Sequence, residues 1–266
     1  MRHAEGTADE RVEVWSIELD REPHEVDQLA LLLDARELTD ACARVRPADR
    51  GRLIVARAAR RQLLARYLDV DPVEVTYLVD RWGRPELDPR HGSDLRFSSA
   101  RSGHRAMVAT TEARSVGIDL EQLRPVPEAM AIASAWFDPT TYRQLVTDPS
   151  VGDDLAFLSR WTALEATLKA VGRGLAAGGH DVRLAHVAAG IVRVREPDGH
   201  GCWETWPLTA AGDGDVVAAV VTEPPRGPVA WQRWTEPHAT GRPHAPVASR
   251  SAHALRTALP PPSLLK

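Results

Sequence analysis

Gly117-Ile118-Asp119-Leu120-Glu121 reads as a β-strand, in which alternate side chains face opposite sides of a sheet. Ile118 and Leu120 are expected to point into the core, so Asp119 and Glu121 project together from the other face. Two acids spaced in this way more often mark a solvated strand edge than a binding site. The pattern therefore predicts a strand of a sheet, and its two acids indicate a binding site only if a second element brings further ligands to them.

Trp161-Thr162-Ala163-Leu164-Glu165-Ala166-Thr167-Leu168-Lys169 supplies that second element and reads as a helix. Its apolar side chains form one face that would dock on a sheet, with Glu165 and Lys169 beside it. Taken alone, a Glu–Lys pair four residues apart is a surface ion pair that stabilises a helix by about 0.2–0.5 kcal/mol. Strand and helix together could bring three carboxylates and one ammonium to a common point.

Three carboxylates gathered at one point repel one another unless a cation neutralises them. Oxygen ligands alone favour Mg²⁺, with Mn²⁺ as an alternative, and magnesium commonly completes its shell with water and phosphate oxygens. Lys169 is also the only lysine before Lys266 in a chain that otherwise uses arginine. A compact ammonium is thus retained at this position, which predicts a site that handles phosphate.

The overall composition sets broad limits on the class of protein. The 266 residues are 43% hydrophobic and 26% charged, as in soluble globular proteins. Neither a membrane-spanning run nor a secretory segment is recognisable, so we expect a cytoplasmic protein without a membrane partner. Cys42 and Cys202 show neither a disulfide framework nor metal-ligand spacing. The net charge of −4 argues against a general nucleic-acid binder.

The hydrophobic patterning predicts helices that alternate with groups of strands. In the first half we expect a helix at 49–67, a turn at Trp82-Gly83-Arg84-Pro85, and strands at 73–79, 95–99, 106–111 and 115–120. In the second half we expect helices at 128–135, 139–146 and 153–171, and strands at 182–186, 191–195, 202–206 and 216–222. The arginine run within 57–66 is interpreted as a solvated helix face, or as a surface for an acidic partner helix.

Each half then consists of helix followed by antiparallel strands. This predicts an α+β, pseudo-duplicated, two-lobed fold with the active site between the lobes. No internal sequence repeat accompanies it, so the duplication is an architectural inference. Residues 11–124 form the expected N-terminal lobe and 125–235 the C-terminal lobe, with Pro125-Val126-Pro127 as linker. Residues 1–10 and 236–266 are expected to be disordered.

The two opening strings, in this order and followed by Gly172-Arg173-Gly174-Leu175, resemble the 4′-phosphopantetheinyl transferases of the larger, surfactin type. The resemblance covers about 50–222. Upstream, Gly83-Arg84-Pro85 and 97–103 stand where the family has its G-[KR]-P and F-[NS]-x-S-H-S-G motifs, and 137–142 resembles its F-x-x-x-E-[FYW] stretch.

The resemblance implies transfer of the phosphopantetheine arm of coenzyme A to a serine of an apo acyl or peptidyl carrier protein, as in polyketide and nonribosomal peptide biosynthesis, with release of adenosine 3′,5′-bisphosphate. By position, Asp119, Glu121 and Glu165 would hold Mg²⁺, and Glu165 would take the serine proton. Lys169 would contact a phosphate, and the nucleotide side of coenzyme A would meet the two arginines Arg52 and Arg84. A monomer is implied, because one chain carries both halves of the site.

Two departures from the family pattern leave alternatives open. Ala100-Arg101 replaces the family's S-H, and Leu164 stands where many members have a lysine. We hypothesise that Arg101 binds coenzyme A and supplies part of the missing charge; otherwise it is a surface arginine. The alternatives to an active transferase are a repurposed reaction or donor on the same metal site, and a non-catalytic module that binds coenzyme A or a carrier protein.

Overall fold

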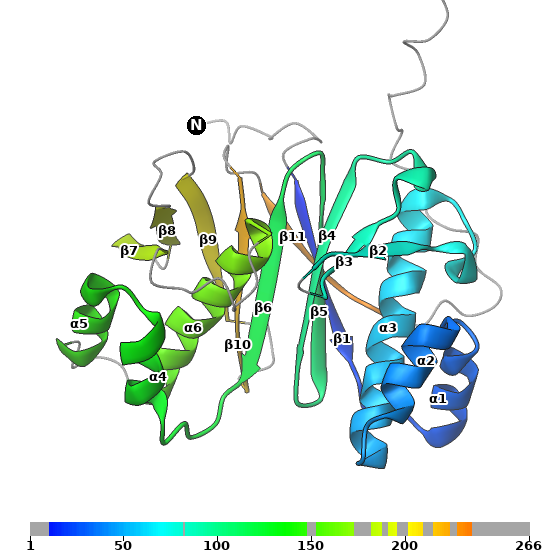
Figure 1. Ribbon diagram of the computed structural model, residues 1–266, viewed down its shortest axis with the longest axis horizontal. Coiled ribbons are helices and arrows are strands. Elements are labelled where there is room, and N and C mark those ends of the chain that lie inside the picture. Colours follow the sequence, from blue (N-terminus) through cyan, green and yellow to red (C-terminus); the bar gives the residue numbers. More distant parts are fainter. Residues whose placement is uncertain are drawn as a thin grey trace, which may run out of the picture.

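The computed structural model describes residues 11–81, 83–147, 153–172, 182–187, 191–195, 202–209, 215–223 and 228–235. It shows a mixed α+β fold of helices packed on sheets whose neighbouring strands are mostly antiparallel, as predicted (Figure 1). The expected disordered ends, 1–10 and 236–266, lie outside the described residues. Among the described helices, none is long and apolar enough to cross a membrane.

The first sheet has four strands in the order β11-β1-β5-β4. Its strands are β1 (Val12–Glu18), β4 (Leu95–Ser102), β5 (Arg105–Glu112) and β11 (Val229–Arg233). The β4–β5 hairpin was predicted, and its turn places Gly103 at a φ of 57°, which glycine adopts readily. β1 and β11 were not predicted. They pair in parallel, so the first and the last strand of the described chain are neighbours in one sheet.

Three helices pack against one face of this sheet: α1 (Pro23–Ala30), α2 (Ala35–Cys42) and α3 (Pro47–Leu68). α3 matches the predicted helix at 49–67 and ends at Asp69, whose backbone is left-handed. Apolar side chains of α3, such as Val55 and Leu63, share a buried cluster with Ile17 and Val108 of the sheet. α1 and α2 were not predicted.

The segment after α3 differs from the prediction. A strand was expected at 73–79, but Pro72–Glu74 forms a 3-10 turn and only β2 (Tyr77–Val79) is extended. The Asp71 carboxylate accepts a hydrogen bond from Val73 N and starts this turn, which removes the first residues from the strand. β2 pairs with β3 (Pro85–Leu87), and a second 3-10 turn (Pro89–His91) leads to β4.

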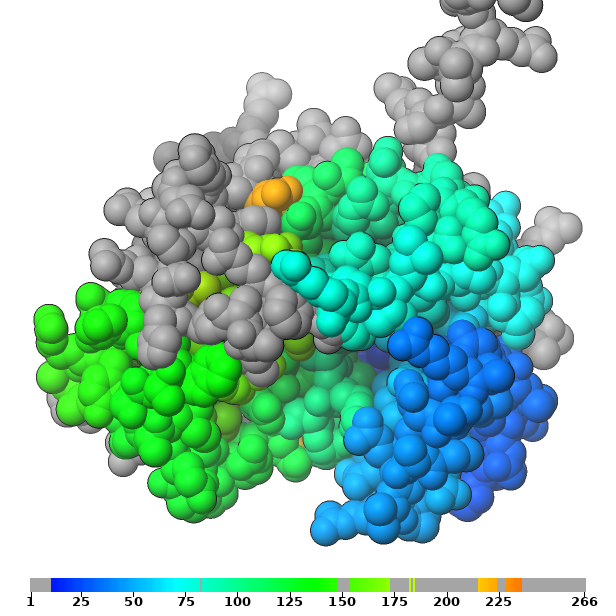
Figure 2. Space-filling model, viewed as in Figure 1, coloured from blue at the N-terminus to red at the C-terminus, as the bar shows by residue number. Residues whose placement is uncertain are grey.

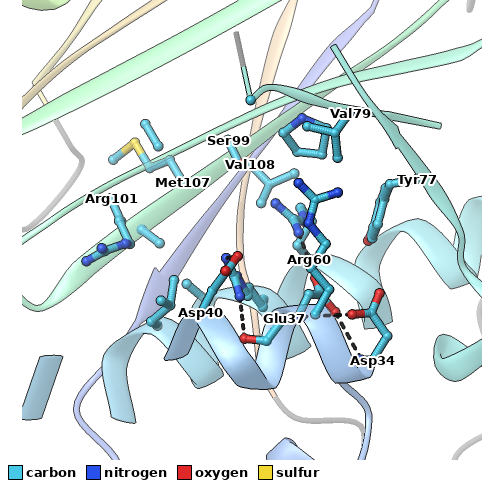
Figure 3. Close-up of a pocket in the computed structure, with 18 of the residues that line it drawn as sticks. Asp34, Glu37, Asp40, Arg60, Tyr77, Val79, Ser99, Arg101, Met107 and Val108 are labelled. Atoms are coloured by element: carbon cyan, nitrogen blue, oxygen red, sulfur yellow. Dashed lines mark hydrogen bonds and ion pairs between the residues drawn. The ribbon is translucent and has the colours of Figure 1, made fainter. Parts of the chain in front are cut away.

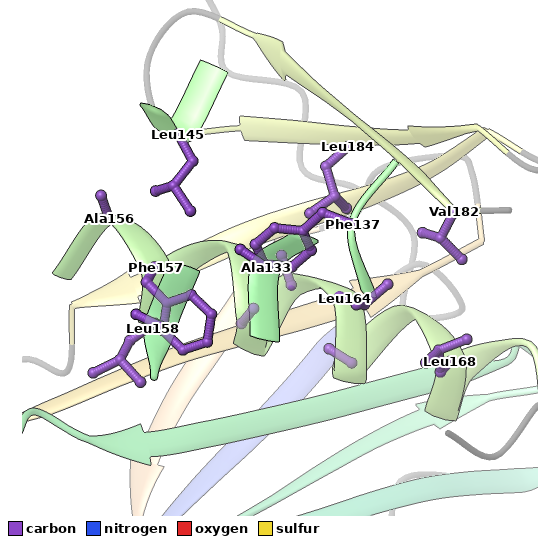
Figure 4. Packing of buried hydrophobic residues seen from close by; sticks show 14 of the residues in the cluster. Ala133, Phe137, Leu145, Ala156, Phe157, Leu158, Leu164, Leu168, Val182 and Leu184 are labelled. Carbon is purple, nitrogen blue, oxygen red and sulfur yellow. The ribbon is translucent and has the colours of Figure 1, made fainter. Parts of the chain in front are cut away.

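The second sheet has five antiparallel strands in the order β6-β10-β9-β8-β7. They are β6 (Val116–Gln122), β7 (Arg183–Val187), β8 (Ile191–Arg195), β9 (Cys202–Thr209) and β10 (Val216–Thr222), all close to predicted strands. α4 (Ala129–Trp136), α5 (Pro139–Thr147) and α6 (Asp153–Ala170) also match predicted helices. Figure 4 shows the apolar cluster in which Phe137, Phe157 and Leu164 pack together with Leu184 of β7.

The two sheets pack against each other through a cluster that includes Val14 and Met107 of the first and Ile118 and Val220 of the second. The order of layers is therefore α3, first sheet, second sheet, α6 (Figure 1). β6 follows the β4–β5 hairpin in sequence but pairs with β10 in the second sheet. This arrangement places β6 between the first sheet and α6.

Candidate active site

β6 and α6 bring the two halves of the predicted site together. The Lys169 ammonium lies 2.7 Å from Asp119 Oδ1 and donates to the Ile118 carbonyl at 3.1 Å. Asp119 is only 4% exposed. Residues fifty positions apart in sequence thus form one ion pair, in which the carboxylate is buried, the ammonium is partly exposed, and the lysine also bonds to the strand backbone.

Gly117 explains how α6 comes so close to β6. A Cβ atom at this position would stand 1.9 Å from the Ala166 carbonyl oxygen and 2.6 Å from Ala170 N, both backbone atoms of α6. Only a residue without a side chain allows this approach. Ile118 and Leu120 are buried between the sheets, as the alternation predicts, so Asp119 turns towards α6.

Glu165 shares this environment. Burial, followed by the negative charge of Asp119, raises the pKa of the Glu165 carboxyl from 4.5 to about 8, against the opposing effect of Lys169. Burial likewise raises the pKa of Asp119, which Lys169 partly offsets and Glu121 reinforces. The carboxylates are therefore close enough to resist ionising together, which is the electrostatic condition that a bound cation relieves.

Glu121 is held by the turn of the β4–β5 hairpin. Ser102 Oγ donates to Glu121 Oε2 at 2.8 Å and accepts from Gln122 N at 3.1 Å. The hydroxyl therefore fixes the carboxylate of the last acid in the strand. Ser102 belongs to the sequence motif at 97–103, but the motif alone does not indicate this contact.

The donor set fits a hard divalent cation in its chemistry. The second carboxylate oxygen of Asp119, Oδ2, is buried and accepts no hydrogen bond from an N–H or hydroxyl group of the described residues; Glu165 can bond to Asp119 only when its own carboxyl is protonated. A buried, unpaired carboxylate oxygen is costly and is commonly satisfied by an ion or water. In the part of the chain that the structure describes, however, no three Asp, Glu, His or Cys side chains stand in an arrangement that holds a metal as they are. The acids would have to reorient around an ion.

A cavity of about 420 Å³ opens beside Lys169. Figure 3 shows Arg60 and Tyr77 on one side of it and Arg101 on the other. Figure 2 shows the surfaces around it, where the blue α1–α2 region adjoins the cyan β2–β3 region. Burial, followed by the charge of Arg44, lowers the pKa of Arg101, and Arg57 adds to the effect. Two other arginines of the cavity are already paired, Arg57 with Asp40 and Arg60 with Glu37, each at 3.0 Å. Arg101 is therefore the cavity arginine that an anion would stabilise most.

The other two predicted coenzyme A contacts lie elsewhere. Arg52 on α3 is paired with Asp20, with its Nε 2.6 Å from Oδ1 and its Nη2 3.0 Å from Oδ2. The Arg84 guanidinium donates to backbone carbonyls, among them that of Lys169. Neither is among the described residues that line the cavity of Lys169 and Arg101. Their contact with coenzyme A stays a prediction.

The structure adds to the interpretation of two features. Leu164 is fully buried in the α6 core cluster, so at this position the chain has a packing residue; that a cation of the family pattern is missing there stays a prediction. The arginine run of α3 is not simply solvated. Arg61 is 2% exposed and bonds to Glu37 Oε2 at 2.6 Å, and Arg60 lines the cavity. The acidic partner lies on α2, which sequence reasoning missed.

Comparison with known proteins identifies the family to which this site belongs. Residues 115–221, from β6 to β10, match the family model of the 4′-phosphopantetheinyl transferase superfamily. The chain is 34% identical over 168 residues to the 4′-phosphopantetheinyl transferase HetI of Nostoc sp., which covers 63% of this chain and 71% of that protein.

Two Bacillus subtilis proteins are more distant. A 4′-phosphopantetheinyl transferase is 25% identical, over 71% of this chain and 83% of that protein, and the 4′-phosphopantetheinyl transferase Sfp is 23% identical, over 57% and 66%. The chain therefore belongs to the 4′-phosphopantetheinyl transferase superfamily and is an enzyme of that class. The family predicted from the motifs is confirmed.

Proposed function

We propose that this enzyme transfers the 4′-phosphopantetheine arm of coenzyme A to a serine hydroxyl of an apo acyl or peptidyl carrier protein. The serine oxygen forms a new bond to the phosphorus next to the pantetheine arm, and the bond from that phosphorus to the bridging oxygen of the pyrophosphate breaks. Adenosine 3′,5′-bisphosphate leaves. The observation that carries the proposal is the Asp119–Lys169 pair beside Glu165, at a cavity lined by arginines.

Asp119, Glu121 and Glu165 would hold Mg²⁺, with Mn²⁺ as an alternative. When bound, the ion neutralises charge on the pyrophosphate oxygens. The buried Oδ2 of Asp119, which accepts no N–H or hydroxyl bond, and the raised pKa of Glu165 support this assignment, since a bound cation would stabilise the ionised form of both carboxyl groups.

Lys169 is the cation expected to act on the reacting phosphates. It lines the cavity while bonding to Asp119, so its ammonium stands between the acids and the space where an anion would lie. Arg101 and Arg60 line the same cavity and can bind phosphate oxygens while staying charged at working pH. Phosphoryl transfer depends chiefly on such positioning and charge neutralisation.

Glu165 is the expected proton acceptor for the attacking serine. Its pKa of about 8 belongs to the ion-free protein, and a bound cation would lower it, so that the carboxylate form is available to accept the hydroxyl proton, directly or through a water. Its position beside Asp119 and Lys169 supports this role, since these are the residues proposed to act on the reacting phosphates.

The test is to incubate the protein with CoA, Mg²⁺ and several apo carrier domains and to measure the intact mass of each carrier. We expect at least one carrier to gain the mass of the phosphopantetheine arm at its serine. Binding of CoA without modification of any carrier would contradict this function and favour a repurposed reaction or a non-catalytic binding module. Because one chain contains both β6 and α6, we propose that the monomer is active.

A further inference from the structure

The hydroxyl of Ser102, at the end of β4, makes two hydrogen bonds to the last residues of β6. It accepts from Gln122 N at 3.1 Å and donates to Glu121 Oε2 at 2.8 Å. Because a serine hydroxyl has a single proton, the bond from the backbone N–H leaves that proton for the carboxylate. Hydrogen bonds to an ionised carboxylate are roughly twice as strong as those between neutral groups. Ser102 therefore ties an acid of the site to the neighbouring sheet.

A second serine of β4 binds β6 in the same way but does not contact an acid. In the described sheets β4 and β6 are both edge strands, so their outer backbone groups need partners from elsewhere. Ser98 Oγ accepts from Ile118 N at 3.1 Å, just as Ser102 accepts from Gln122 N. Of the two serines, only Ser102 bonds to a carboxylate among the described residues. Its bond to Glu121 is thus additional to what holds the two strands together.

Glu121 is the acid of the site that most needs such a bond. Asp119 is buried and paired with Lys169, whereas Glu121 is half-buried and next to the last residue of β6. After burial, which is the largest cause, the charge of Glu121 contributes to the raised pKa of both Asp119 and Glu165. The three carboxylates thus repel one another, and this repulsion favours a Glu121 side chain turned towards solvent. The bond from Ser102 opposes that rotation.

We propose that Ser102 is a positioning residue whose hydroxyl holds the Glu121 carboxylate beside Asp119 and Glu165, where a divalent cation would meet it. Carboxylates that bind metals are commonly held by outer hydrogen bonds, and loss of such a bond lowers metal affinity or activity about 10–100-fold. The inference rests on the proposed role of Glu121 as a metal ligand. It adds a residue that acts through that ligand.

The first test measures the Kd for Mn²⁺ from the EPR signal of the free ion, without CoA or a carrier protein. Ser102→Ala should raise this Kd about tenfold. Ser102→Thr keeps the hydroxyl and should stay within about threefold of the parent protein, whereas Ser102→Val, which has nearly the same shape without a hydroxyl, should resemble Ser102→Ala. The matched control is Ser98→Ala, which also removes an acceptor from a β6 N–H and should change the Kd by less than about twofold.

Three results of this titration would overturn the proposal. The first is a Kd that changes by less than about threefold in folded Ser102→Ala and Ser102→Val. The second is an equal rise in Ser98→Ala, which would show that the strand contact matters and the carboxylate contact does not. The third is a parent protein that binds no Mn²⁺, which would remove Glu121 as a ligand. Failure to modify any carrier while Mn²⁺ still binds would contradict only the proposed transfer reaction.

A second test needs no metal. Ser102→Ala, Glu121→Ala and the double variant are compared by denaturant unfolding in the presence of a chelator. Ser102→Ala should lower the folding equilibrium constant at least about threefold more in the parent protein than in the Glu121→Ala background, because the second background no longer has the carboxylate to hold. The lost acceptor for Gln122 N cancels in this comparison. Equal effects of Ser102→Ala in both backgrounds would refute the tie between the hydroxyl and Glu121.

Discussion

Replacing Glu165 with glutamine should stabilise the metal-free protein at alkaline pH, although it removes the proposed base. The rise of the Glu165 pKa from 4.5 to about 8 corresponds to a cost of about 5 kcal/mol for ionising this group in the folded state, taking about 1.4 kcal/mol per pKa unit. Because Asp119 and Lys169 share in the effect, we expect Glu165→Gln to raise the free energy of unfolding at alkaline pH by only about 2 kcal/mol.

The sign of the pH dependence follows from the direction of the shift. A carboxyl whose folded pKa lies above its unfolded value binds more protons in the folded state, so its contribution is fully present below about pH 4.5 and is lost as pH rises through about 8. Glu165→Gln and the parent protein should therefore be equally stable at about pH 5. At about pH 9 the variant should be more stable, by about 4–8 °C in Tm.

Denaturant and thermal unfolding at both pH values provide the measurement, with Glu112→Gln, at an exposed acid of β5, as control. Adding Mg²⁺ at about pH 9 should raise the stability of the parent protein but much less that of Glu165→Gln. A stability difference between the two that is the same at both pH values would refute the electrostatic reasoning.

Three further predictions follow from the site. Arg101→Ala should raise the KM for CoA about tenfold with a smaller change in kcat, because a cavity guanidinium is lost; steady-state kinetics that show an unchanged KM would return Arg101 to an ordinary surface residue. Lys169→Met should raise the affinity for Mg²⁺ in the absence of CoA, because the ammonium no longer competes with the ion for Asp119. Calorimetric titration should detect the tighter binding of Mg²⁺, and weaker binding would contradict that competition. Gly117→Ala should destabilise the fold by about 3 kcal/mol or more, because its Cβ would meet the α6 backbone. The control is Gly51→Ala, whose Cβ would be 3.8 Å from Val26 and which should change stability by less than about 1 kcal/mol. Equal unfolding midpoints for the two variants would argue against close packing of α6 on β6.

The helices that the sequence predicts best are the long ones. α3 has 22 residues and α6 has 18, and both lie at the expected positions, as does the apolar strand β6; the unpredicted α1 and α2 have 8 residues each. β1 and β11 escaped prediction because their pairing joins opposite ends of the described chain. The strand expected at 73–79 was wrong because the Asp71 side chain starts a turn, a local hydrogen bond that β-propensity does not reveal.

The candidate site also has a part that the sequence predicts and a part that it does not. The convergence of Asp119 with Lys169 is predictable, because strand alternation and helix spacing fix the directions of both side chains. The cavity that adjoins them is not predictable in this way, since Arg60 and Arg61 of α3 pair with Glu37 of α2, a helix of only 8 residues elsewhere in the sequence. Similarly, a G-[KR]-P motif places Arg84 near the site but does not show which way its side chain turns.

The most direct test of the central claim is whether one cation and the pyrophosphate of CoA share a site at Asp119. The measurement is the ³¹P relaxation of bound CoA in the presence of Mn²⁺, for the parent protein and for Asp119→Asn. We predict strong paramagnetic relaxation of both pyrophosphate phosphorus atoms in the parent protein and its loss in the variant, with CoA still bound. Equal relaxation in both proteins would contradict the claim.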